Sequence, residues 1–267
     1  MTPTLHFYDL GPSVVAFSST RQGGFSVGPY AAFNINHYCG DDEEHIALNR
    51  HALCQLLQVS DDRLLMPHQT HDTRVATIDE AFLALSPESR QEALEGIDAV
   101  MTNLAGVCIG VSTADCIPVL LYDEEHHAVC AVHAGWRGTV KRIVMKAVAA
   151  MTTRYGALSE HLVAQIGPGI SLDSFEVGNE VYDAFRTEGF EMSAISRRYR
   201  ASDDDSKEKW HLDLPLCNRQ QLLEAGLPAH AISVLPVCTF QQSERFFSAR
   251  RLGINSGRIF TGICLRP

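Results

Sequence analysis

A cysteine and two histidines stand where apolar runs of the sequence give way to small and polar residues. Cys116 lies in Thr113-Ala-Asp-Cys116-Ile-Pro, His133 opens His133-Ala-Gly-Trp-Arg-Gly138, and His71 ends Met66-Pro-His-Gln-Thr-His71. One thiolate and two imidazoles are a ligand set for a catalytic metal ion, which keeps one coordination position open. By residue type and spacing alone, a buried cysteine and a core histidine are the more common case.

The same residues also allow a metal-free nucleophile. In that interpretation Cys116 attacks the substrate, His133 is its base, and the helix expected to start at Gly135 provides an oxyanion or phosphate cradle. Residue types do not separate this hydrolase from a metal centre, so both hypotheses stay open at this point.

Two neighbouring apolar runs are expected to bring Cys116 and His133 together. Residues 117–122 and 128–133 read as strands joined by an acidic tip, which predicts a β-hairpin with the two residues at its open end. His71 must come from a separate turn. His68 precedes it by three residues, but a turn does not force the two rings to converge.

The remaining pattern predicts an α+β fold in a single domain spanning residues 1–267. Strands are expected near residues 14–19, 107–111, 163–166, 233–236, 246–248 and 259–263, and helices over 41–57, 135–155, 175–188 and 213–226. Asp213 is the expected N-cap of the last helix and Gly156 the end of the second. Strands and helices mix without regular alternation, which argues against a doubly wound parallel sheet. The charge run at residues 202–209 is expected to be a mobile loop.

Composition excludes several classes of function. The chain has 267 residues and a net charge of −10, which argues against nonspecific binding to nucleic acid or anionic membranes. No apolar run approaches a membrane span, and no signal peptide is visible. The eight cysteines are scattered without CxxC pairs, so we expect a cytoplasmic protein. Binding of an anionic substrate by so acidic a chain calls for a local basic cleft.

Across residues 15–264 the chain resembles the YfiH family, also called the laccase-domain or multicopper polyphenol oxidase family. The motifs that carry the resemblance are Ser19-Thr-Arg-Gln-Gly-Gly-Phe-Ser26, Asn34 with Cys39-Gly-Asp41, Asn49-Arg50, Gln69-Thr-His71, Thr113-Ala-Asp-Cys116-Ile-Pro-Val, His133-Ala-Gly-Trp-Arg-Gly138, Gly167-Pro, Phe175-Glu-Val-Gly178, Cys238-Thr239, Phe246-Phe-Ser-Ala-Arg-Arg251 and Gly257-Arg258. One departure is Ala249, which stands where relatives commonly carry Tyr.

The resemblance implies a layered α/β/β/α sandwich with mixed sheets, related to the catalytic domain of cytotoxic necrotizing factor. It implies a zinc ion on His71, Cys116 and His133, which would serve as the catalytic centre, and substrate contacts from Asn34 and Arg50. Copper is possible at the same soft ligands. The implied partners are purine nucleosides and phosphate, with no nucleic acid and no membrane, and the chain is expected to be a monomer or a weak homo-oligomer.

The function predicted from these observations is a zinc-dependent purine nucleoside phosphorylase with adenosine deaminase and methylthioadenosine phosphorylase activity. Three alternatives remain: a Cys–His hydrolase linked to quality control of peptidoglycan precursors, a copper polyphenol oxidase, and a noncatalytic partner protein with a structural metal. The sequence contains 12 histidines but no HxH pair. Because multicopper oxidases use many paired histidines, this argues against the oxidase.

Overall fold

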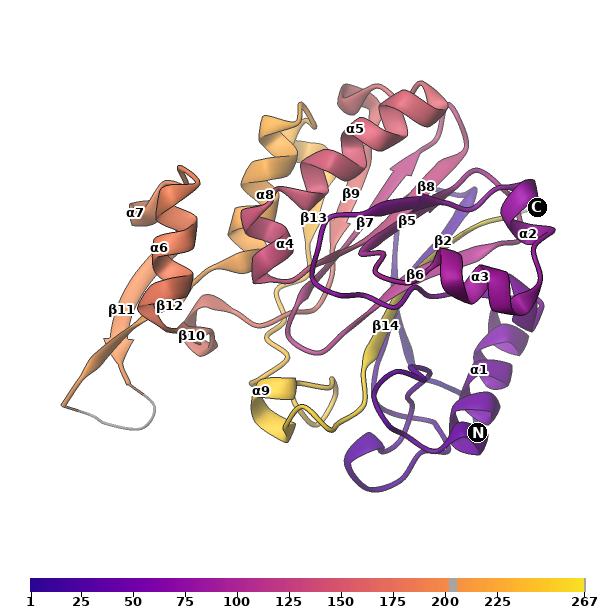
Figure 1. Cartoon of the computed structure of the whole chain (residues 1–267), viewed down its shortest axis with the longest axis horizontal. Helices are drawn as coiled ribbons and strands as arrows, with labels where there is room; N and C mark the ends of the chain where they lie inside the picture. The colour runs from indigo at the N-terminus through magenta and orange to yellow at the C-terminus, as the bar shows by residue number, and fades with distance from the viewer. Residues whose placement is uncertain (202–205, 267) are drawn as a thin grey trace.

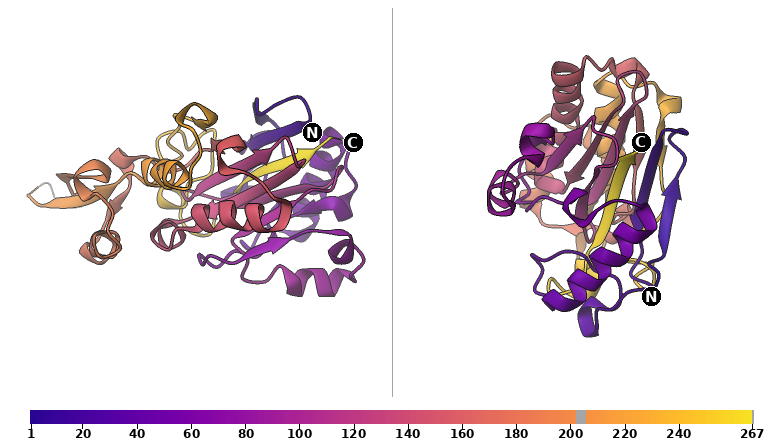
Figure 2. Two further views of the ribbon diagram at one scale, coloured as in Figure 1. Left: turned by 90° about the horizontal axis from the view of Figure 1, so that it is seen from above. Right: turned by 90° about the vertical axis from the view of Figure 1, so that its right-hand side faces the viewer.

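Two β-sheets stack face to face in the computed structural model, and helices cover their outer faces (Figure 1, Figure 2). The structure describes residues 1–201 and 206–266. The first sheet has the order β1 (Leu5–Tyr8), β2 (Val14–Ser19), β14 (Ile259–Leu265), β6 (Cys108–Thr113), β3 (Leu64–Leu65). The second has the order β13 (Ile232–Val234), β9 (Val163–Ile166), β7 (Ile117–Asp123), β8 (Ala128–Ala134), β5 (Ala99–Thr102), β4 (Val75–Thr77). Both sheets contain parallel and antiparallel pairs.

Apolar side chains from the two sheets meet in a core between them. Val111 and Ile263 of the first sheet pack with Leu120, Val129 and Ala131 of the second, and all five are fully buried. Fully burying a side chain of this size contributes roughly 1.5–3 kcal/mol. This core explains why the central strands read as continuous apolar runs rather than as alternating ones.

Helices complete a four-layer arrangement. On the outer face of the second sheet, α5 (Ile143–Tyr155) and α8 (Leu214–Glu224) bury Ala147 and Cys217 with the strands beneath them. On the outer face of the first sheet, α1 (Glu43–Leu57) buries Leu53 against Phe17 and Phe260. The predicted α/β/β/α sandwich with mixed sheets is therefore confirmed.

A small third sheet extends from one side of the molecule, at the left of Figure 1. It has the order β10 (Glu176–Val177), β12 (Glu208–Leu212), β11 (Ser196–Arg200), and α6 (Asn179–Thr187) and α7 (Met192–Ile195) accompany it. Tyr182 of α6 stacks on Trp210 of β12 with ring centroids 4.0 Å apart. The other short elements are α2 (Glu80–Leu83), α3 (Pro87–Ala93), α4 (Trp136–Val140), α9 (Ala249–Leu252) and the 3₁₀ turns Gly28–Tyr30, Asp61–Arg63, Ser159–His161, Leu172–Ser174 and Ala229–Ala231.

Several predicted elements are confirmed. β7 and β8 form the expected hairpin, with Pro118 paired to His133. Asp213 caps α8 by accepting a hydrogen bond from the backbone N–H of Leu216, and Gly156 ends α5 in the left-handed conformation. No helix in residues 1–201 and 206–266 is long and apolar enough to cross a membrane.

The single helix predicted over residues 135–155 is wrong, because it divides into α4 and α5. Arg142 takes a left-handed conformation (φ 62°) between them. The backbone carbonyl of Thr139 accepts hydrogen bonds from the backbone N–H of Arg142, at 3.0 Å, and from the side chain of Gln221, at 2.7 Å. A tertiary contact with α8 thus supports the backbone where the helix breaks.

Three further expectations need correction. The helix expected over residues 175–188 starts only at Asn179, because residues 176–177 pair with β12. Residues 246–248 are not a strand: Phe246 and Phe247 are fully buried, but as loop residues. Of the expected mobile loop at 202–209, residues 202–205 lie outside the described part of the chain, whereas residues 208–209 belong to β12.

Candidate metal centre

His71, Cys116 and His133 converge at one end of the β7–β8 hairpin. Their potential ligand atoms all lie within 4.8 Å of one another. The Nε2 atom of His71 is 3.8 Å from Sγ of Cys116, and the two imidazole rings meet edge to face with centroids 4.8 Å apart. His71 is exposed, Cys116 half-buried and His133 buried, so the cluster opens to solvent on the His71 side.

The backbone places each of the three side chains differently. Cys116 directly precedes β7, and His133 is the last residue but one of β8. His71 lies in a loop and takes a left-handed conformation with φ 63°, and Asp115 beside Cys116 has φ 90°. Such values are uncommon for residues with a Cβ and concentrate at functional sites.

Asp98, which the sequence analysis missed, ties two of these residues together. Its buried carboxylate is 2.8 Å from Nδ1 of His133. It also accepts hydrogen bonds from the backbone N–H groups of Thr70, His71 and Asp72, at 2.9–3.2 Å. Because Nδ1 of His133 is occupied, Nε2 is the nitrogen left for a ligand or a substrate. The sequence could have drawn attention to Asp98, because this acidic residue stands directly before the apolar strand β5.

The three side chains fit a metal ion of the zinc type. Ligands at roughly 2.3 Å (sulfur) and 2.0 Å (nitrogen) from a tetrahedral ion lie about 3.5 Å apart, close to the separation of Sγ and Nε2 of His71. Gly135 leaves the necessary space: a Cβ there would lie 2.8 Å from Cδ2 of His71 and 3.0 Å from Sγ of Cys116. Three protein ligands leave one position for water or substrate, and the same donors accept copper.

Electrostatic coupling favours the ionised forms of the site. Burial alone would raise the pKa of the Cys116 thiol, but the charge of His133 and hydrogen bonds from both histidines lower that pKa to about 6. Burial alone would lower the pKa of His133, but Cys116 and Asp98 raise it to about 9. The pKa of Asp98 is lowered despite its burial, by its hydrogen bond with His133 and by backbone amides. A thiolate is the form that binds metals and attacks electrophiles.

A cavity of about 200 Å³ opens over this cluster. Its lining residues come from the loops around residues 36–39, 67–71 and 112–116, and also include His133, Ala249, Ile254 and Arg258. A second, more open cavity of about 380 Å³ adjoins it, lined by Asp115, Ile170, Phe175, Ala249, Arg250 and Ile254. Ala249 and Ile254 line both cavities, so the two cavities adjoin, and we call them together the recess.

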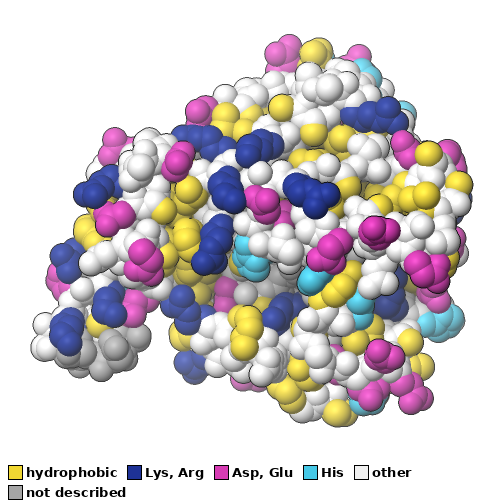
Figure 3. All heavy atoms as spheres, in the orientation of Figure 1, with side chains coloured by type: hydrophobic (Ala, Val, Ile, Leu, Met, Phe, Trp, Pro, Cys, Tyr) yellow, Lys and Arg dark blue, Asp and Glu magenta, His cyan; other side chains and the backbone are white. Residues whose placement is uncertain are grey.

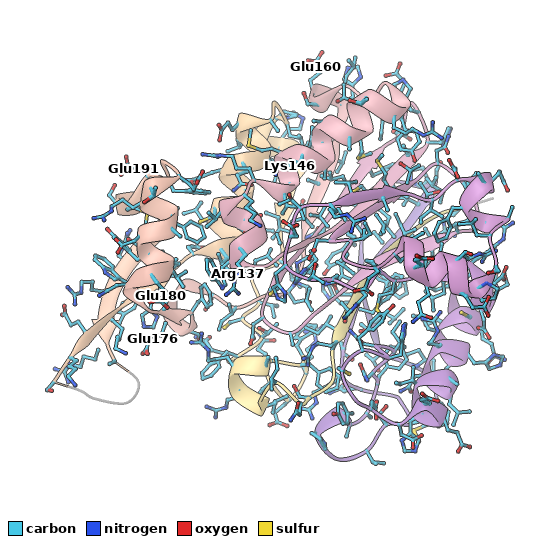
Figure 4. The ribbon with its side chains drawn as sticks, in the orientation of Figure 1. Arg137, Lys146, Glu160, Glu176, Glu180 and Glu191 are labelled. Atoms are coloured by element: carbon cyan, nitrogen blue, oxygen red, sulfur yellow. The ribbon has the colours of Figure 1, made fainter. Side chains whose placement is uncertain are left out.

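Two arginines, Arg258 and Arg250, contribute to the lining of the recess in a molecule with a net charge of −10. Figure 3 shows Lys and Arg side chains on the same face as the exposed histidines. Two of them carry labels in Figure 4: Arg137, stacked 4.3 Å over Trp136 at the start of α4, and Lys146 on α5, which donates a hydrogen bond to Thr73. Neither residue lines the two cavities, so the local basic cleft expected from the sequence stays a prediction.

Comparison with known proteins gives consistent results. The family model described as "Multi-copper polyphenol oxidoreductase laccase" matches residues 15–266. The chain belongs to this laccase-domain family. It is 46% identical to a Bacteroides thetaiotaomicron protein named purine nucleoside phosphorylase, with 93% of this chain and 90% of that one aligned. It is also 46% identical to adenosine deaminase RL5 from an unknown prokaryotic organism, over 94% and 93% of the two chains. The crystal structure of YlmD from Geobacillus stearothermophilus superimposes with a TM-score of 0.87 at 30% identity, covering 97% and 94% of the two chains.

The name of the laccase-domain family suggests several copper ions, but the described residues supply one such cluster. Within residues 1–201 and 206–266, one group of three or more His, Cys, Asp or Glu side chains could hold a metal ion. It consists of His71, Cys116 and His133. His68 stays outside this group. Its ring pairs with Glu95 at 2.8 Å and stacks on Tyr38, with centroids 4.1 Å apart.

The structure does not bring Asn34 and Arg50, the substrate-contacting residues expected for this laccase-domain chain, into the lining of the recess. Asn34 is fully buried, where its amide donates to Asp41 and its carbonyl accepts from the backbone N–H of Arg258. Arg50 donates to the backbone carbonyl of Leu64 at 2.8 Å. Both residues hold the loops and strands behind the cavity wall.

Proposed function

We propose that this chain is a zinc-dependent purine nucleoside phosphorylase that also deaminates adenosine and cleaves methylthioadenosine. The observation that carries the proposal is the convergence of His71, Cys116 and His133 at the floor of a polar recess. The names of the relatives, purine nucleoside phosphorylase and adenosine deaminase, support the substrate class.

His71, Cys116 and His133 would hold the zinc ion. When bound, zinc supplies a Lewis acid that activates water for removal of the 6-amino group of adenosine. The protein's own contribution is to hold these side chains in place. Asp98 fixes the ring of His133 through Nδ1, and the same carboxylate fixes the backbone at His71. Second-sphere partners of this kind orient metal ligands.

The two reactions make different demands on the recess. In deamination, water adds at C6 of the purine and ammonia leaves. In phosphorolysis, a phosphate oxygen bonds to C1′ of the ribose, the C1′–N9 bond breaks with its electron pair on the purine, and the phosphate's proton goes to the released base. Phosphorolysis therefore needs two ligands in adjacent positions. The two adjoining cavities, of about 200 and 380 Å³, offer room for both.

A panel of purine nucleosides, incubated with and without phosphate and analysed by chromatography, tests the proposal. Free base and ribose 1-phosphate should form only with phosphate present, and inosine should form from adenosine in either case. Metal analysis should find one zinc per chain, lost in Cys116→Ala. No product from any purine nucleoside at high enzyme concentration would refute the proposed activity.

A Cys–His hydrolase is the second candidate, and one observation favours it. Cys116, His133 and Asp98 follow the order nucleophile, base and orienting carboxylate. This alternative, acting on an amide or ester such as a peptidoglycan precursor, predicts stoichiometric alkylation of Cys116 in fully active, metal-free protein. A copper polyphenol oxidase instead predicts oxidation of phenols by copper-loaded protein.

The proposal also includes the oligomeric state of the chain and the cellular compartment in which it works. All eight cysteines are free, which supports a reducing compartment where Cys116 stays available as a thiolate. We expect a monomer or a weak homo-oligomer, a property that light scattering over a range of concentrations would measure.

A further inference from the structure

Arg258 brings a positive charge into the cavity that contains the metal centre. It stands directly before β14, whose first residue, Ile259, pairs with Thr113 at the end of β6. Arg258 and Thr113 are therefore neighbours at adjoining strand ends, and both line the cavity. Burial raises the pKa of the Cys39 thiol, and the charge of Arg258 opposes this rise, which places the guanidinium near a third lining residue.

The guanidinium of Arg258 is anchored by backbone carbonyls rather than by an acid. Nη1 donates to the carbonyls of Ser256 and Gly257, and Nη2 donates to that of Ile254. Among the described residues, no carboxylate forms an ion pair with it. A guanidinium has five N–H groups, so the Nε–H and one N–H on Nη2 remain. Adjacent N–H groups of this kind bind two oxygens of a phosphate together.

Thr113 supplies an unused hydroxyl among the residues that line the same cavity. Its side chain is 1% exposed, and Oγ1 has no hydrogen-bond partner among the described residues. A buried hydroxyl without a partner costs stability, so it points to a ligand that would satisfy it. The neighbouring side chains, by contrast, are committed: Asn36 donates to Ser112 Oγ, and Gln69 binds both backbone groups of Ser112.

The position of Arg258 is itself held by a buried residue. The side-chain carbonyl of Asn34 accepts hydrogen bonds from the backbone N–H groups of Arg258 and Asn36, both at 3.2 Å. Asn34 therefore fixes two segments of the cavity wall without touching the cavity. Its effect on substrate binding would be exerted through Arg258.

We propose that Arg258 and Thr113 form the subsite that binds inorganic phosphate, the second substrate of phosphorolysis, beside the metal centre. This inference rests on the proposed function and assigns the phosphate to the part of the smaller cavity that Arg258 and Thr113 line. A volume of about 200 Å³ is below the usual range for drug-sized ligands and suits a small anion. The arginine supplies the charge-assisted contacts and the threonine a neutral one.

The experiment compares Arg258→Gln and Thr113→Val with the wild type and with a matched control, Arg186→Gln. Arg186 is exposed on α6, where it pairs with Asp183 outside the recess. Three quantities are measured on the zinc-loaded protein: the KM for inorganic phosphate in phosphorolysis, the rate of adenosine deamination, and the binding of inorganic phosphate by calorimetry.

Loss of a charge-assisted contact should raise the KM for phosphate roughly ten- to a hundredfold in Arg258→Gln, and loss of a neutral one up to about tenfold in Thr113→Val. The ratio of phosphorolysis to deamination should fall, because deamination uses no phosphate. Thr113→Val should also keep or raise the melting temperature, since it removes a hydroxyl that no protein group satisfies. Arg258→Lys, which keeps the charge, should recover part of the phosphate affinity if the Gln variant folds poorly.

An unchanged KM for phosphate in Arg258→Gln, or an equal fall of deamination and phosphorolysis, would overturn the subsite. The proposed function fails separately. If the wild type cleaves no nucleoside but binds phosphate in a manner that depends on Arg258, the subsite stands and the phosphorylase assignment falls. If the wild type shows neither activity nor phosphate binding, both fall.

Discussion

The carboxylate of Asp98 lies 2.8 Å from Nδ1 of His133 and 2.9 Å from the backbone nitrogen of His71. One buried acid thus holds a residue of β8 and a loop that reaches the cluster from a distant part of the sequence. Its removal would loosen two of the three ligands at once. Substitution of Asp98 therefore tests whether His71, Cys116 and His133 form an organised metal site or only lie close together.

Asp98→Asn should weaken zinc binding by about ten- to a hundredfold, the usual effect of losing a second-sphere carboxylate. The amide keeps the shape of the side chain but offers one acceptor oxygen where two are used. Competition with a chromogenic chelator would measure the affinity. Asp72→Asn, at a half-exposed neighbour paired with Lys141, is the control, and equal effects of the two substitutions would contradict the role of Asp98.

The reactivity of Cys116 should follow its lowered pKa. Because that pKa is about 6, the thiolate form predominates above pH 6, and alkylation of the metal-free protein by iodoacetamide should reach its plateau near neutral pH. Replacing His133 with Asn removes the imidazolium charge that stabilises the Cys116 thiolate. The pH midpoint of Cys116 alkylation should therefore move upward. Mass spectrometry of the labelled peptide reports Cys116 separately from Cys108 and Cys130, whose pKa values burial raises. A midpoint near 9 in the wild type would disprove the coupling.

Gly135→Ala should abolish metal binding while leaving the fold intact. The φ of Gly135, −67°, suits alanine, so the backbone is not strained. The added methyl group would nevertheless meet the ring of His71 and the sulfur of Cys116 at 2.8 and 3.0 Å. Zinc content by atomic absorption and folding by circular dichroism are the two readouts. Full zinc occupancy in the variant would mean that these side chains are not the ligands.

Arg50→Gln should act mainly on stability. The guanidinium is partly buried and donates to the carbonyl of Leu64, so its loss should cost about 1–3 kcal/mol in free energy of unfolding. Denaturant titration measures this cost. Its effect on the KM for phosphate should be smaller than that of Arg258→Gln. A larger effect of Arg50→Gln than of Arg258→Gln on the KM for phosphate would instead support the substrate contact that the family resemblance implied for Arg50.

Local sequence signals predicted those elements that depend on short-range chemistry. The acidic tip between two apolar runs predicted the hairpin that carries Cys116 and His133, and Asp213 predicted the start of α8. The division of α4 from α5 could not be predicted in the same way. It is accompanied by a tertiary contact from Gln221, which is distant in the sequence and donates to the carbonyl of Thr139. Phe246 and Phe247 read as a strand because burial, rather than pairing, selects their apolar side chains.

The candidate site divides along similar lines. Residue type and family motifs pointed to His71, Cys116 and His133, which the fold brings together. Asp98 was missed, and Arg258 was noted only as part of a family motif without a role, because an acid or an arginine beside a strand is common until its partner is known. Arg258 owes its place to register, since β14 pairs with β6 across more than half the chain.

The two ends of the recess are built on different kinds of structure. Cys116 directly precedes β7 and His133 lies on its partner strand β8, in a sheet covered by another sheet and by helices. Ala249, by contrast, is the first residue of the short helix α9, and Ile254 and Arg258 belong to the segment between α9 and β14. Surface segments of this kind accept substitution and insertion far more readily than a sheet does. We therefore expect substrate range to change more readily through substitutions in this segment than through changes in the sheet. Two relatives, each 46% identical to this chain, are named for different reactions on nucleosides.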